Sequence, residues 1–70
     1  MLPLWAVAYV DYYDNEILIE FVHSPDFRQA VCQHSKVGGI EEIPSDILTD
    51  EAVREFFWNG DILIEAKEVP

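Results

Sequence analysis

The sequence predicts an α+β domain: a small three-stranded, mainly antiparallel sheet with two short helices on one face, in the order ββααβ. Three segments rich in β-branched and aromatic residues have the composition of strands. Two other segments place helix-capping residues ahead of apolar positions at helical spacing. A chain of 70 residues has room for one thin core, so we expect residues 1–70 to form a single domain.

The first two strands form a predicted hairpin. Residues 4–13 and 16–23 are both rich in β-branched and aromatic types, and the polar pair Asp14-Asn15 separates them. In the first strand we expect Trp5, Val7 and Tyr9 to share the buried face, although the other face is also apolar and leaves the assignment open. That other face carries Ala6, Ala8 and Val10.

The second strand and the last strand, residues 61–68, share a four-residue pattern. Residues 17–20 and 62–65 both read Ile-Leu-Ile-Glu, each after an acidic residue. Side chains alternate between the two faces of a strand, so the pattern predicts isoleucines that face inward and a mixed acidic and leucine face outward. The residues expected on the outward face are Glu16, Leu18 and Glu20 from the second strand and Asp61, Leu63 and Glu65 from the third.

The first helix is predicted to begin at Ser24-Pro25-Asp26, which offers a hydroxyl cap, a proline for the first helical position and a carboxylate near the positive end of the helix dipole. We expect Gly38-Gly39 to end this helix. Its buried stripe, at helical spacing, is Phe27, Ala30, Val31 and His34.

The second helix is predicted to begin after Thr49, which can cap it, and to close at Gly60 in a left-handed conformation. The acidic connection before it, residues 40–48, has room for a short helical turn after Pro44. Arg54 and Trp58 are four residues apart, so their side chains can stack on the outer side. The inward side chains expected from this helix are Val53, Phe56 and Phe57.

The charge of the chain restricts its partners. Fourteen carboxylates against four Lys and Arg give a net charge of −10, which opposes direct binding to DNA, RNA or an anionic membrane. The second half carries most of the charge, with nine acids and two bases in residues 38–70. In composition alone the chain resembles the DNA-mimicking inhibitors that phages deploy against host nucleases and defence complexes. That resemblance implies a protein partner with a basic, nucleic-acid-binding surface.

We therefore expect a small acidic binding protein, an inhibitor of phage or mobile-element origin, that is not an enzyme. The alternative is a structural or accessory module, as a homodimer or as a subunit of a larger complex, with a mainly apolar interface. Many cytoplasmic proteins are acidic only for solubility, so the charge alone does not decide between them. The residues expected to contact a partner are Glu16, Leu18, Glu20, Glu51, Glu55, Trp58, Asp61, Leu63 and Glu65.

Catalytic and metal-binding patterns are weak. Cys32 and His34 are two residues apart on a predicted helix, whereas metal ligands on helices recur at a spacing of three or four. No serine lies in a nucleophile elbow, and no glycine-rich phosphate loop follows a strand. We expect no catalytic residue, no metal and no cofactor. A single cysteine and a short apolar N-terminus that soon meets Asp11 favour the cytoplasm over secretion or a membrane.

Overall fold

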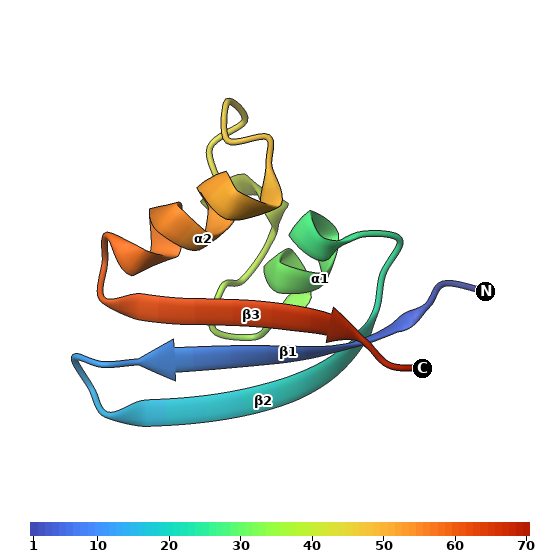
Figure 1. The fold of residues 1–70 in the computed structure, drawn as a ribbon, viewed down its shortest axis with the longest axis horizontal. Helices are drawn as coiled ribbons and strands as arrows, with labels where there is room; N and C mark the ends of the chain where they lie inside the picture. Colours follow the sequence, from blue (N-terminus) through green and yellow to red (C-terminus); the bar gives the residue numbers. More distant parts are fainter.

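The computed structural model describes residues 1–70 and confirms the α+β class and the ββααβ order (Figure 1). The sheet has the strand order β2-β1-β3, and β1 pairs antiparallel with both neighbours. A chain that leaves β2 must cross the sheet to reach β3, and the two helices make that crossing on one side (Figure 1). The elements are β1 (Leu4–Asp11), β2 (Glu16–His23), α1 (Phe27–Gln33), the 3-10 turn η1 (Ile40–Glu42), α2 (Asp50–Trp58) and β3 (Ile62–Glu68).

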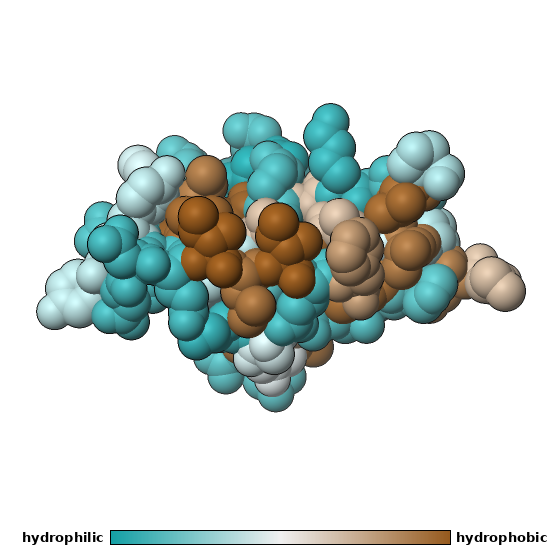
Figure 2. Space-filling model, turned by 90° about the horizontal axis from the view of Figure 1, so that it is seen from below, coloured by the Kyte–Doolittle hydropathy of each residue, from teal (hydrophilic) through white to brown (hydrophobic).

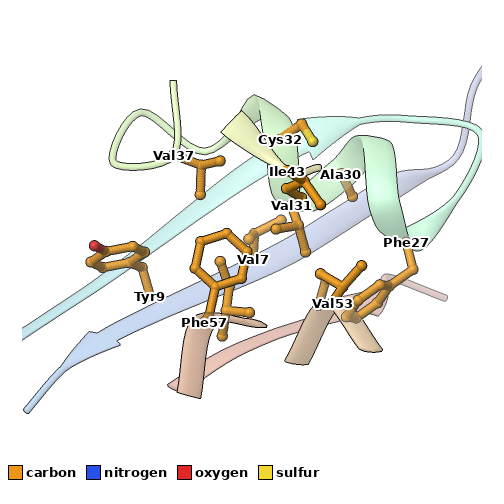
Figure 3. Packing of buried hydrophobic residues seen from close by; sticks show 12 residues of the cluster. Val7, Tyr9, Phe27, Ala30, Val31, Cys32, Val37, Ile43, Val53 and Phe57 are labelled. Atoms are coloured by element: carbon orange, nitrogen blue, oxygen red, sulfur yellow. The ribbon is translucent and has the colours of Figure 1, made fainter. Parts of the chain in front are cut away.

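The core lies between the helices and one face of the sheet (Figure 3). β1 contributes Val7 and Tyr9 to it, which confirms the predicted inward face of that strand, with Trp5 packed at its margin. The helices close over these side chains because their apolar positions recur at helical spacing. The twelve buried members of the core are Val7, Tyr9, Phe27, Ala30, Val31, Cys32, Val37, Ile43, Val53, Phe57, Ile64 and Ala66.

The hairpin is confirmed, with a longer turn than predicted. β1 ends at Asp11, two residues earlier than expected. The side chain of Asp11 accepts hydrogen bonds from the N–H groups of Tyr13 and Asp14 at 2.9 and 3.0 Å, which holds the chain in the turn. Asn15 takes a left-handed conformation with φ of 58°, which asparagine tolerates better than most residues.

The buried stripe of α1 is confirmed, but both predicted ends of this helix are wrong. Asp26 is the cap, and its side chain accepts from the N–H of Gln29 at 2.8 Å, so Ser24 and Pro25 lie before the helix. The helix ends at Gln33, five residues before Gly38, because His34 turns to an extended conformation with ψ of 135°.

The cap of α2 is confirmed, because the Thr49 hydroxyl accepts from the N–H of Ala52 at 3.1 Å. The predicted left-handed end at Gly60 is wrong: Asp61 takes that conformation, with φ of 62°. β3 therefore begins at Ile62, and Asp61 lies in the turn instead of the strand. Of the three expected inward side chains, Val53 and Phe57 are buried and Phe56 is half-buried.

The connection between the helices is held by Arg28 of α1. Its guanidinium donates to the carbonyl groups of Ile43, Pro44 and Ile47, so one cation satisfies three acceptors along the loop. The helical turn expected after Pro44 lies before it instead, as η1.

The predicted faces of β2 are inverted. Leu18 lies opposite Tyr9, which is in the core, so Glu16, Leu18 and Glu20 point toward the helix side of the sheet. Ile17, Ile19 and Phe21, expected inward, are exposed on the opposite face. The physical reason is that β2 is an edge strand. Its helix side remains partly exposed to solvent and can accommodate carboxylates that find polar partners.

Candidate protein-binding face

The face of the sheet turned away from the helices is covered by no element of the chain, and we call it the open face. The register places its side chains in three rows across the strands. In each row a large apolar residue of β2 stands beside a smaller residue of β1. The rows are Ile17-Val10-Leu63, Ile19-Ala8-Glu65 and Phe21-Ala6-Lys67.

The large side chains of the open face are strongly exposed. Ile17 is 72% exposed, Ile19 56% and Phe21 65%, and Leu63 on the far strand is 43% exposed. Figure 2 views the molecule from below, which is the side on which β2 lies in Figure 1. In this view hydrophobic side chains form a band across the middle of the molecule. Single exposed apolar residues are ordinary on a protein surface, whereas a contiguous group of them indicates an interaction surface.

The open face is uneven, with a ridge along β2 and a hollow beside it. The hollow has a volume of about 200 Å³ and lies over Ala6 and Ala8, with Ile19 on one side and Glu65 and Lys67 on the other. Its form follows from the rows, because alanine on the central strand leaves a depression between larger neighbours. A complementary protein surface would place an apolar side chain in this hollow.

The outer edge of β2 is covered by the last residue of α1 and by the segment that follows it. The Gln33 side chain donates to the carbonyl of His23 at 2.9 Å, and Ser35 donates to the Glu20 carboxylate from both its N–H and its hydroxyl. The pKa of Glu20 is lowered by these hydrogen bonds from Ser35. Side chains bound along an edge strand obstruct the addition of a further strand there.

The same segment is fixed at two further points. Lys36 forms an ion pair with Glu16 at 2.8 Å, and this bond raises the pKa of the Lys36 ammonium. His34 is fully buried, stacks on Tyr9 at 5.4 Å, and places Nε2 3.1 Å from the carbonyl oxygen of Leu18. Its Nδ1 accepts from the N–H of Lys36 at 3.1 Å, so Nε2 must carry the proton that is donated to Leu18.

The edge of β3 is occupied by a cluster around Arg54. Its guanidinium donates to Glu65 at 2.9 to 3.3 Å and to Glu51 at 2.6 Å, and it lies over the ring of Phe27 at 4.6 Å. The hydrogen bonds from Arg54 lower the pKa of Glu65. The Glu65 carboxylate also accepts from the N–H of Ala66 at 3.1 Å, so the carboxylate of this open-face residue is already bonded within the chain.

The predicted contact residues do not share one surface. Leu63 and Glu65 lie on the open face, whereas Glu16, Leu18 and Glu20 lie on the helix side of β2. Trp58 meets the ring of Tyr12 edge-on at 5.7 Å, and Arg54 contacts Phe27 instead of stacking on Trp58 as expected. The remaining predicted contact residues are Glu51 and Glu55 on α2 and Asp61 in the turn after it.

The residues that dominate the open face were missed because they fit the pattern of a core strand. Their alternation with glutamates is equally compatible with either face. One signal pointed to the observed arrangement: the other face of β1, which pairs with this surface, is made of small apolar residues. Those residues are Ala6, Ala8 and Val10.

Six of the ten exposed acidic residues lie in one stretch on the helix side of the molecule. Residues 41–55 hold these six, in the loop and along α2, which lie above the sheet in Figure 1. The basic residues on the two helices are Arg28 and Arg54, and both side chains are already bonded to groups of this chain. The six exposed acids of this stretch are Glu41, Glu42, Asp46, Asp50, Glu51 and Glu55.

The chain has one cysteine, and its side chain is enclosed. Cys32 is buried, and burial raises the pKa of its thiol. No three side chains of the His, Cys, Asp and Glu types are placed to hold one metal ion. No helix of the chain has the length and apolar character needed to cross a membrane.

Comparison of the chain with family models, with curated proteins and with solved structures found no match.

Proposed function

We propose that this chain is a non-enzymatic protein-binding module of the cytoplasm and that its interface is the open face of the sheet. The observation that carries the proposal is the exposure of Ile17, Ile19 and Phe21, which stand side by side on an uncovered face. Fully burying one such side chain contributes about 1.5–3 kcal/mol, so burying three that are already partly covered contributes on the order of 3–6 kcal/mol before the cost of association.

The two sheet edges support the same choice of surface. A sheet binds a protein either by adding a strand at an edge or by covering a face. Gln33 and His34 bond to the carbonyl groups of His23 and Leu18 on β2, and the Glu65 side chain accepts from the N–H of Ala66 on β3, so backbone groups of both strands are already engaged. The open face remains as the surface that a partner can cover without breaking bonds of the chain.

A capture experiment with two matched variants tests the proposal. Ile19→Glu places a charge in the middle of the open face, and Leu48→Glu makes the same change at a 78% exposed position in the loop before α2. The tagged proteins are incubated with a lysate of the cells that express the chain, which also contains the untagged chain. Wild type and Leu48→Glu should capture a protein that Ile19→Glu does not capture. The untagged chain counts as such a protein. Equal capture by all three would refute the open face as the interface.

A second candidate function uses the opposite side of the molecule. The six exposed carboxylates of residues 41–55 favour an acidic inhibitor, of phage or mobile-element origin, that occupies a basic nucleic-acid-binding surface. Such binding should weaken steeply with salt and should be lost when Glu51 and Glu55 are replaced by glutamine. It should be unchanged in Ile19→Glu, which is the result that separates it from the first candidate.

A further inference from the structure

We propose that the occupant of the open face is a second copy of this chain, which forms a two-fold symmetric dimer by stacking sheet on sheet. This inference rests on the proposed function, since it names the partner of the same surface. Three properties of the open face carry it: its charge, its relief and its area.

The charge of the open face selects against a basic partner. Its acidic member, Glu65, is bound by Arg54, and its other charged member is the base Lys67. Glu16 and Glu20, the acids on the neighbouring strand, point to the helix side and are bonded to Lys36 and Ser35. A basic partner would therefore find no unpaired carboxylate on this face. A second open face brings no unpaired acid, so it meets no repulsion between carboxylates.

The relief of the open face is self-complementary. In a two-fold dimer each contact occurs twice, so a ridge on one copy requires a matching hollow on the same surface. A two-fold axis that runs parallel to the strands, above β1 and in the plane between the two sheets, places β2 of one copy over β3 of the other. The ridge formed by Ile17, Ile19 and Phe21 then lies over the β3 flank of the hollow, which Glu65 and Lys67 line, and the reciprocal contact follows by symmetry. An axis across the strands would set ridge on ridge.

The area of the open face fits a dimer of modest affinity. Three strands spaced about 4.8 Å apart, over seven residues of about 3.3 Å each, span roughly 300 Å² in projection. Two such faces bury on the order of 1,000 Å² of accessible surface, near the lower limit for a specific interface. We therefore expect a dissociation constant on the order of micromolar.

The acids determine how salt acts on this dimer. Stacked sheets are about 10 Å apart, so the two acidic helix layers face away from each other, roughly 30 Å apart. The Debye length is about 8 Å at 0.15 M salt and about 30 Å at 0.01 M, so repulsion between the helix layers acts only at low salt. The dimer should therefore become tighter as salt rises, and binding to a basic partner would become weaker.

Sedimentation equilibrium on the purified chain tests the proposal. From micromolar to millimolar concentration at 0.15 M salt, the mass of wild type and Leu48→Glu should rise from 8.1 kDa toward twice that value. Ile19→Glu should remain a monomer, and its circular dichroism spectrum should match that of wild type because the side chain is exposed. For wild type, the dissociation constant should be several-fold larger at 0.01 M salt than at 0.15 M.

Three outcomes would overturn the proposal. Wild type that stays monomeric at every concentration would exclude a second copy, and a dimer that survives Ile19→Glu would place the contact elsewhere. A dimer that weakens as salt rises would indicate an ionic contact. If wild type is monomeric but lysate capture still depends on Ile19, the second copy is refuted and the proposed function stands with another protein. If capture is also independent of Ile19, both are refuted.

Discussion

Replacing His34 with phenylalanine would keep an aromatic ring against Tyr9 while removing two hydrogen bonds, one that ties the segment after α1 to the sheet and one within that segment. In the wild-type protein Nε2 donates to the Leu18 carbonyl and Nδ1 accepts from the N–H of Lys36, each at 3.1 Å. The phenylalanine ring offers neither a donor nor an acceptor. The substitution therefore leaves one carbonyl and one N–H without partners at a fully buried side chain.

The size of the effect follows from the burial of those groups. A buried polar group left without a partner costs about 1–3 kcal/mol. The two backbone groups here are partly buried, so we expect His34→Phe to lower the free energy of unfolding by about 2–3 kcal/mol in total. The whole domain is stabilised by roughly 4–10 kcal/mol, and each kcal/mol lowers the Tm of such a chain by about 4–8 °C. The Tm should fall by about 10–20 °C.

Urea denaturation followed by tryptophan fluorescence measures this loss, with Tyr9→Phe as the control that changes the other ring of the stack and keeps both hydrogen bonds. Hydrogen exchange adds a local measurement. The exchange rate of the Lys36 amide should rise in His34→Phe and should not change in Tyr9→Phe. If His34→Phe costs no more than Tyr9→Phe, and the Lys36 amide stays protected, then His34 does not hold the segment along β2. The argument that this edge is closed to a further strand would then fail.

Two further predictions concern the helix side. The hydrogen bonds from Arg54 lower the folded pKa of Glu65 below its ordinary 4.5, so they contribute stability above that pH and lose it as pH falls through the lower folded value. In urea denaturation, Glu65→Gln should be less stable than wild type at pH 7, and the difference should shrink at pH 3; a constant difference would contradict this. Thr49→Ala removes the cap of α2 and should cost about 1 kcal/mol, with Thr49→Ser close to wild type.

The pattern of the sequence predicted the elements of the fold because each has a local cause. The hairpin follows from a polar turn between two β-rich segments, and α2 follows from Thr49 ahead of apolar positions at helical spacing. The class and the order of elements followed from these alone. Where a helix ended depended on tertiary contacts: α1 stops at Gln33 because the next ring turns into the core and bonds to β2, which no local pattern records.

The face of β2 could not be derived from alternation, because the decisive quantity is how much of the sheet the helices cover. Helices of seven and nine residues are only about 10 and 14 Å long, and α2 packs on β3. At the uncovered margin, Glu16 and Glu20 are tolerated on the helix side because Lys36 and Ser35 reach them. The contact face was missed for the same reason, since an isoleucine-rich face of a strand is ordinarily the buried one.

The separation of charge from apolar surface gives the acidity of this chain a physical role that needs no nucleic-acid mimicry. A small domain with an exposed apolar face is prone to associate without order, and like charge on every copy opposes that. Because the acids of residues 41–55 stand on the helix side, the repulsion acts least when two open faces meet and most in other orientations. The net charge of −10 would then select one arrangement among many. An inhibitor that competes with nucleic acid needs the same charge to face its partner, so the sign of the salt dependence separates the two roles of the acids.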